Sequence, residues 1–203
     1  MSCAGVEDVA SGADRVFVER ASEHIHVAAS LMKLPLVVAA YRLADRGLLD
    51  LDAPVPVHNV HASALDGAPY ACTPDYDQDD ATWDRQGSAA PLRWLCRQAI
   101  VRSGNLATNL VLEHVRRAGW GEVARALSEC DAAHGTVVSR GIQDEAAAAA
   151  GLANLVTAGD MGRLMRAIAR GAAASPASCA ELVEVLDAQE WRDGIAAGVP
   201  AGT

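Results

Sequence analysis

The chain contains a single lysine, Lys33, three residues after Ser30 in the stretch SLMK, while the other sixteen of its 17 basic residues are arginines. A serine hydroxyl is a weak nucleophile until a base takes its proton, and lysine can be that base when burial lowers its pKa. Arginine stays protonated in proteins and cannot replace it. Because residues three apart share one face of a helix, the pair predicts a nucleophilic serine beside its base. The alternative is a solvated lysine that follows a serine by chance.

A second motif with polar side chains is Ser103-Gly104-Asn105. It separates two stretches in which apolar residues recur at helical spacing. A hydroxyl and a carboxamide two residues apart on a tight turn would both face the cleft that the turn borders. A turn with local capping is the simpler interpretation of these three residues alone. The SxxK motif earlier in the chain favours the catalytic interpretation.

The elements that would position these residues are mostly helices. Apolar side chains recur at helical spacing from about Ser30, and Gly47 then ends that helix as a C′ residue. Pro35 fits only in the first turn, which places the helix start at Ser30 or just after it. The alanine-rich stretch 144–151 favours helix but is short for an isolated one. Further helices are predicted over 88–101, 106–119 and 121–131, from Thr157 to Gly171, and from Ser175 or Ser178 onward.

Strand signals are confined to the start of the chain. The short runs 2–8 and 15–20, separated by a Gly/Ser/Asp turn, predict a hairpin. Residues 50 to 90 hold four prolines and the acidic stretch PDYDQDDATWDRQGS, and they predict an irregular surface excursion. Two strands alone make a marginal sheet, and no partner strand is evident after residue 20. The chain is therefore either a helical bundle with a decorating hairpin or one that lacks part of a sheet.

Composition argues against several classes of function. The 203 residues fit a single domain, and a formal net charge of −9 would repel a phosphate backbone, so nucleic acid is not expected as a partner. The apolar run 34–41 is far shorter than the ~18 to 20 residues needed to cross a bilayer, so no membrane span is expected. The first residues lack a secretory signal. This predicts a cytoplasmic location as supplied, or a secreted or periplasmic one if the amino terminus is incomplete.

Cysteine and histidine patterns predict neither a disulfide framework nor a metal site. The five cysteines are widely spread and form no CxxC pair. His58 and His61 form an HxxH motif, but no carboxylate pattern accompanies them, and Pro56 argues against a helix that presents both. No metal and no cofactor is therefore expected.

SxxK and SGN in this order resemble the serine β-lactamase and penicillin-binding protein family, specifically its class A β-lactamase-like branch. AASLMKLPLVVAAYRLADRG is similar to the family's nucleophile helix, and RSGNLATNLVLEHV is similar to its SxN segment. VVSRGIQDEAAAAAGLANLVTAGDMGRLMRAI is similar to its Ω loop and the following helix. The resemblance covers most of residues 2 to 203. It implies an α+β fold, with a helical lobe and an antiparallel sheet of which only the N-terminal hairpin is present, so mostly α as supplied.

The resemblance also implies roles for the polar residues. Ser30 would form the acyl-enzyme, and Lys33 would help to activate it. Ser103 would relay a proton to the leaving nitrogen. Asn105 would hold the amide side chain of a small-molecule or peptide substrate.

The Ω-loop stretch departs from the family pattern at its main carboxylate. The family's deacylating Glu sits two residues after an Arg, and counting from Arg140 that position holds Ile142. Asp144 and Glu145 follow two and three residues later as candidate deacylation bases, and Asn154 replaces the acidic partner of the Arg. Without a placed base to activate water, the acyl-enzyme should persist.

Both ends of the chain depart as well. GVPAGT at 198–203 is similar to the turn before the family's KTG strand, and the family's N-terminal helix has no counterpart before Ser2. We therefore expect one domain over 1–203 that lacks the N-terminal helix and the C-terminal strands and helix. The implied function is a serine hydrolase acting on β-lactams or related amides and esters, with slow deacylation. Two alternatives stay open: a DD-peptidase or transpeptidase-like acyltransferase, and an inactive truncated remnant that acts as a binding protein.

Overall fold

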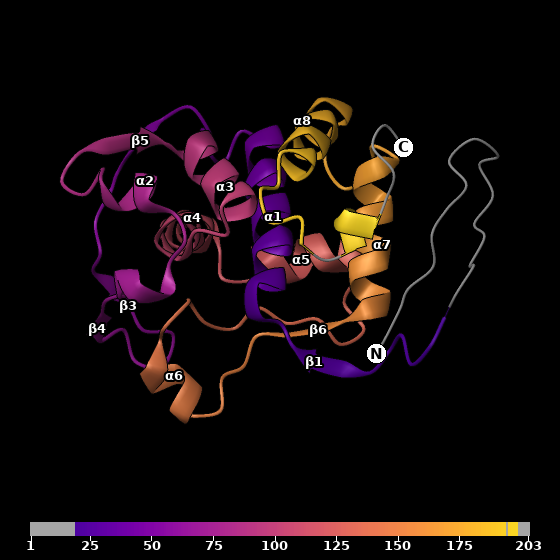
Figure 1. Cartoon of the computed structure of the whole chain (residues 1–203), viewed down its shortest axis with the longest axis horizontal. Coiled ribbons are helices and arrows are strands. Elements are labelled where there is room, and N and C mark those ends of the chain that lie inside the picture. The colour runs from indigo at the N-terminus through magenta and orange to yellow at the C-terminus, as the bar shows by residue number, and fades with distance from the viewer. Residues whose placement is uncertain (1–18, 194, 199–203) are drawn as a thin grey trace.

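The computed structural model describes residues 19–193 and 195–198, and the predicted hairpin lies outside them except for its last two residues. A central helix, α1 (Lys33–Asp45), organises the helical part (Figure 1). Between Lys33 and Leu43 all of its residues except Arg42 are buried. A helix buried on every side is a core helix, so other helices pack around it. These are α3 (Leu92–Val101), α4 (Asn105–Ala118), α5 (Glu122–Glu129) and α8 (Pro176–Asp187).

Local sequence signals set several helix ends where they were predicted. α1 has Pro35 in its first turn and is followed by Gly47 with a φ of 68°, a left-handed conformation that glycine adopts without strain. Its start differs from the prediction of Ser30 or just after it, because Ala29–Met32 form a 3₁₀ helix and α1 begins only at Lys33. α7 (Ala158–Ala169) begins after Thr157, whose hydroxyl accepts a hydrogen bond from the first turn. Ser175 caps α8 in the same way, which decides between the two predicted starts.

Short strands pair into three two-stranded antiparallel sheets within the described ranges. Two expectations were therefore wrong: partner strands do occur after residue 20, and the region 50 to 90 is not wholly irregular. Strands of two or three residues are too short to show an alternating pattern, and the prolines in three of them resemble loop signals. The pairs are β1 (Ile25–Val27) with β6 (Leu155–Thr157), β2 (Pro54–Pro56) with β5 (Ala89–Pro91), and β3 (His61–Ala62) with β4 (Pro69–Tyr70).

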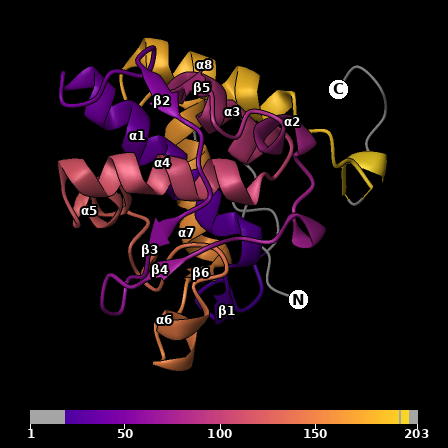
Figure 2. The ribbon, with the colours of Figure 1, turned by 90° about the vertical axis from the view of Figure 1, so that its left-hand side faces the viewer.

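The fold class is α+β and mostly helical, as predicted. In both views α6 projects from the side of the molecule that carries β1 and β6 (Figures 1 and 2). None of the helices in the described part of the chain is long and apolar enough to cross a membrane. The short helices are η1 (Ala29–Met32), η2 (Pro74–Tyr76), α2 (Asp80–Trp83), α6 (Glu145–Ala149) and η3 (Ile195–Gly198).

Candidate active site

Lys33 is the first residue of α1, and its side chain is only 2% exposed. The buried ammonium donates three hydrogen bonds, and all of them run to the SGN turn. Nζ lies 2.5 Å from the backbone oxygen of Ser103, 3.0 Å from its Oγ and 2.8 Å from Oδ1 of Asn105. The structure thus brings together the two motifs that the sequence placed about 70 residues apart.

Ser30 joins this group through a second serine. It lies in η1, the turn that leads into α1, and its side chain is exposed. Oγ of Ser103 donates a hydrogen bond of 2.9 Å to Oγ of Ser30. A continuous chain of hydrogen bonds therefore links the exposed hydroxyl of Ser30 to the buried amine of Lys33 through Ser103.

Burial changes the acidity of the lysine. Desolvation lowers the pKa of Lys33 from 10.5 to about 8, although the negative charges of Asp77 and Asp79 work in the opposite direction. A lysine with this pKa is mostly protonated at neutral pH, but its neutral form is far easier to reach than that of a solvated lysine. The lowered pKa is a property that a general base requires.

Left-handed backbone conformations occur at three non-glycine residues around this group. Ala29, Ser103 and Gln143 have φ angles of 45°, 57° and 60°. Each such conformation costs about 1 to 3 kcal/mol and persists only where the surrounding structure enforces it. Ala29 directly precedes Ser30, and Ser103 is itself the hydrogen-bond partner of Ser30.

Asp77, from the excursion (residues 50–90), contacts the SGN turn. Its Oδ1 accepts a hydrogen bond from the N–H of Asn105 at 2.9 Å, and its Oδ2 accepts one from the N–H of Leu106 at 2.9 Å. The carboxylate thus caps α4, where unpaired N–H groups and the helix dipole favour negative charge. Nε1 of Trp83 donates to the same carboxylate at 2.9 Å and holds it in place.

Asp79 lies directly behind Gly104 and is fully buried. A Cβ atom on Gly104 would come within 2.6 Å of Oδ2 of Asp79, so the close packing requires glycine here. Gln98 donates to Oδ1 at 2.7 Å, and Thr82 donates to Oδ2. Burial raises the pKa of this carboxyl group. Neither aspartate was predicted to belong to the site, because the side chains of an acidic stretch are ordinarily exposed to solvent.

A surface cavity of about 530 Å³ opens beside Asn105. Nδ2 of Asn105 donates a hydrogen bond of 2.5 Å to the backbone oxygen of Tyr76, whose own side chain is 77% exposed. The carboxamide is therefore held from two sides, and it still has a second N–H for a ligand. The cavity is lined by Ala71, Thr73, Tyr76, Asn105, Ile142, Gln143 and Glu145.

The predicted Ω-loop residues form the far wall of this cavity. Asn109 of α4 binds both backbone polar groups of Ile142: the N–H donates to Oδ1 at 2.8 Å, and the C=O accepts from Nδ2 at 3.0 Å. At the base of the loop, Asn154 makes the same pair of contacts with the backbone of Arg140, at 3.1 and 3.0 Å. The loop is thus closed by amide side chains. Ile142 lines the cavity, and its partly buried side chain also packs against the hydrophobic core.

The two candidate deacylation bases occupy different environments. Asp144 is fully buried, accepts hydrogen bonds from Oγ of Ser63 at 2.8 Å and from the N–H of Ala64 at 2.7 Å, and caps α6. Its carboxylate therefore attaches the Ω loop to the excursion. Glu145 is exposed and lines the cavity with Asn105. Of the two carboxylates, only Glu145 borders the space in which a substrate could lie.

Residues 4–203 match the β-lactamase enzyme family. A search of curated protein sequences gives no significant match. Among solved structures, PBP-A is 22% identical with a TM-score of 0.70, and the comparison covers 91% of this chain and 62% of PBP-A. A leucine-to-glutamate mutant of PBP-A, solved as an acyl-enzyme complex with penicillin G, gives a TM-score of 0.69, with 22% identity and coverage of 91% of this chain and 62% of that one.

Two β-lactamases show the same likeness. The β-lactamase from Sphaerobacter thermophilus is 23% identical with a TM-score of 0.67, over 91% of this chain and 63% of that one. The ancestral class A β-lactamase GNCA is 25% identical with a TM-score of 0.74, over 96% of this chain and 68% of that one. The chain thus spans less than two thirds of PBP-A and of the Sphaerobacter enzyme. Because the family match extends over nearly the whole sequence, this chain belongs to the β-lactamase enzyme family.

Proposed function

We propose that this chain is a serine hydrolase that forms an acyl-enzyme at Ser30 with β-lactams or related amides and esters, and that it releases the acyl group slowly. The observation that carries the proposal is the hydrogen-bonded chain from Ser30 through Ser103 to the buried amine of Lys33. Family membership and the solved neighbours support the substrate class.

Acylation starts from neutral Lys33. The proton of Ser30 passes to Oγ of Ser103 while Ser103 gives its own proton to Nζ, which reverses the two hydrogen bonds of the protonated state. Oγ of Ser30 then forms a bond to the carbonyl carbon of the substrate. When the carbon–nitrogen bond breaks, the proton returns from Nζ through Ser103 to the leaving nitrogen. General-base help of this kind is worth about 10²- to 10⁴-fold in rate.

The cavity beside Asn105 is the region in which the rest of the substrate would lie. Because Oδ1 of Asn105 is held by Lys33 and Nδ2 by Tyr76, the orientation of the carboxamide is fixed before a ligand arrives. Its remaining N–H can donate to an amide oxygen of the substrate. This supports the binding role predicted for Asn105.

Deacylation requires a base that activates water beside the ester carbon. Ile142 stands at the position that the family resemblance assigns to that base, and an aliphatic side chain cannot accept a proton. The acyl group should therefore stay on Ser30 until a stronger nucleophile than water arrives. This favours, as a second candidate, an acyltransferase of the transpeptidase type, in which an amine acceptor takes the acyl group.

Intact-protein mass spectrometry after incubation with penicillin G tests the proposal. The expected result is one adduct of the mass of penicillin G, located on Ser30 by peptide mapping and absent from the Ser30→Ala variant. After removal of free penicillin, the adduct should decay slowly, and faster when an amine acceptor such as a D-amino acid is added. A folded chain that gives no adduct on Ser30 would overturn the acylation claim.

The remaining alternative is a binding protein without catalysis. It differs from the proposal in one measurable respect, because a non-covalent ligand dissociates when the protein is denatured. Two results together would favour the binding protein: release of penicillin from the wild-type chain in denaturant, and equal affinities of the wild type and Ser30→Ala for penicillin. Penicillin that remains attached in denaturant would exclude it.

A further inference from the structure

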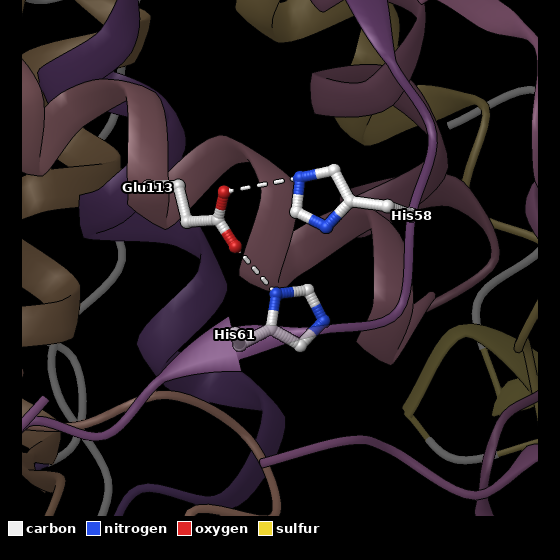
Figure 3. Close-up of side chains that lie close together, drawn as sticks. All are labelled: His58, His61 and Glu113. Atoms are coloured by element: carbon white, nitrogen blue, oxygen red, sulfur yellow. Dashed lines mark hydrogen bonds and ion pairs between the residues drawn. The ribbon is translucent and has the colours of Figure 1, made fainter. Parts of the chain in front are cut away.

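Two imidazoles and a carboxylate meet where the excursion crosses α4 (Figure 3). Oε1 of Glu113 lies 2.5 Å from Nδ1 of His61, and Oε2 of Glu113 lies 3.4 Å from Nε2 of His58. One potential ligand atom from each residue lies within 4.8 Å of the other two. The HxxH motif had no carboxylate nearby in the sequence because its carboxylate comes from a helix 52 residues further along the chain.

From this cluster we infer that His58, His61 and Glu113 form a binding site for a divalent transition-metal ion of the zinc class, separate from the serine site. Neutral imidazole and carboxylate are ligands that Zn²⁺ and its neighbours in the first transition row prefer. Calcium and magnesium prefer oxygen ligands throughout, so a set of two nitrogens and one carboxylate does not suit them.

The spacing fits an ion after a small adjustment. In a tetrahedral site with bonds of about 2.1 Å, neighbouring ligand atoms lie roughly 3.4 Å apart. The contact between His58 and Glu113 already has that length, at 3.4 Å. The 2.5 Å contact between His61 and Glu113 would have to open by about 1 Å, which a rotation of the carboxylate achieves. The ligand atoms, which lie up to 4.8 Å apart, would also have to move together. An ion would thus replace one hydrogen bond and one ion-pair contact with three ligand bonds.

His61 is the buried member of the cluster. Its side chain is 2% exposed, yet its Nε2 has no hydrogen-bond partner among the described residues. Nε2 is not the ring nitrogen that faces Glu113, so it lies outside the ligand set, and His61 would bind an ion through Nδ1.

The site is reachable from solvent. His58 is 39% exposed at its side chain, and His58 and Glu113 both line a surface cavity of about 700 Å³ with Arg116, Arg117 and Trp120. Arg117 lies 3.5 Å from Oε2 of Glu113 through an exposed guanidinium, which can turn away when an ion enters. Three protein ligands leave the fourth position of a tetrahedral ion open to water from this cavity.

The position of the site indicates its role. Glu113 belongs to α4, the helix that starts at Asn105, while His58 and His61 belong to the excursion that later supplies Asp77 to the start of that same helix. An ion here would fasten the excursion to α4 at a second point. We therefore assign it a stabilising function, because binding to the folded state alone raises the stability of that state.

Cobalt(II) titration followed by visible absorption tests the site, since the spectrum reports the ligand types. We expect one bound Co²⁺ with a tetrahedral nitrogen and oxygen spectrum and without a sulfur-to-cobalt charge-transfer band, because the four described cysteines are buried free thiols. Affinity should fall at least about tenfold in Glu113→Gln and in His58→Ala. Since the side chain of His58 is partly exposed, its replacement keeps the fold and separates lost binding from lost structure.

The matched control is His24→Ala, which removes one ring of the other close histidine pair, His24 and His26, whose ring centroids lie 4.8 Å apart. It should bind Co²⁺ like the wild type, and Zn²⁺ should raise the Tm of both but not of His58→Ala. Unchanged affinity in Glu113→Gln, a cysteine charge-transfer band, or equal weakening by His24→Ala would each overturn the assignment.

Discussion

The amine of Lys33 lies 3.0 Å from Oγ of Ser103, a residue 70 positions later in the chain. This contact fixes two properties of the site at once. It gives a buried ammonium a partner that can carry a proton, and it places that partner within 2.9 Å of the exposed hydroxyl of Ser30. The following predictions test what each part of this arrangement contributes.

Lys33→Arg should slow acylation by a β-lactam by about 10²- to 10⁴-fold. The guanidinium keeps its proton, so it cannot serve as the base even if it keeps the positive charge. Mass spectrometry of the penicillin adduct over time measures the rate, and Lys33→Met is the matched variant that removes both the charge and the base. A Lys33→Arg chain that acylates at the wild-type rate would show that the lysine is not the base.

The acylation rate of the wild type should rise with pH and level off above about pH 8. Because burial lowers the pKa of Lys33 to about 8, the neutral amine becomes about tenfold rarer with each pH unit below that value. Rates with a chromogenic β-lactam between pH 6 and pH 9.5 give the profile. A flat profile in this range would contradict a titrating base in the rate-determining step.

The same shift makes the folded state more stable at alkaline pH. The folded pKa is lowered to about 8 from 10.5, so between these values the unfolded chain binds more protons at Lys33 than the folded chain does. Stability therefore rises with pH in this window, by roughly 3 kcal/mol at most, at 1.36 kcal/mol per pKa unit. Buried thiols act in the opposite direction, since burial raises the pKa of Cys72 to about 11.

The difference between wild type and Lys33→Met isolates the lysine from those thiols. Urea denaturation at pH 8 and pH 10 gives the free energy of unfolding of both chains. The free energy of unfolding of the wild type should rise relative to that of the variant as the pH increases, because the variant has no amine to titrate. A difference that is the same at both pH values would mean that Lys33 keeps its ordinary pKa in the folded state.

Ile142→Glu should shorten the lifetime of the acyl-enzyme. Residue 142 lines the cavity with Asn105, and Asn109 binds both its backbone N–H and its C=O, so the backbone that would carry a carboxylate is held in place. A placed base is worth about 10²- to 10⁴-fold in the hydrolytic step. Ile142→Gln, which has the same length and no base, is the control. Equal lifetimes for the two variants would argue against a missing base as the cause of slow deacylation.

Gly104→Ala should destabilise the chain and slow acylation, although its backbone conformation suits alanine. The new Cβ would lie 2.6 Å from Oδ2 of Asp79, and overpacking of this kind typically costs about 1 to 3 kcal/mol. In a chain that already carries Asp79→Ala, Gly104→Ala should lower the free energy of unfolding by less, because the clash with Oδ2 is removed. Gly198→Ala is the control, since a Cβ there meets nothing within 4 Å. Strictly additive changes would show that Asp79 is not what constrains Gly104.

The residues to which we assign the chemistry could be selected from the sequence because their signals are local. Ser30 and Lys33 are one turn apart, and Ser103 and Asn105 belong to one turn. The helices around them were also predictable, because their apolar spacing repeats over several turns, and α3 starts a few residues late only because Ala89–Pro91 form a strand. The contact between the two motifs was expected from the resemblance alone, since no local pattern specifies it.

The supporting residues were not predictable for the same physical reason. Asp77 caps a helix that starts 28 residues after it, and Glu113 pairs with histidines more than 50 residues before it. Such partners are set by how the excursion folds back over α4, which depends on the whole core. Pairing of two- and three-residue strands is likewise decided by tertiary packing rather than by propensity.

The burial of a solitary lysine makes the site visible to spectroscopy. Because Lys33 is the only lysine, growth on ¹⁵N-labelled lysine places a single labelled side-chain nitrogen in the chain, and that nitrogen is hydrogen-bonded to Ser103. One ammonium resonance would then report protonation, acylation of Ser30 and the motion of the SGN turn, without assignment of any other signal.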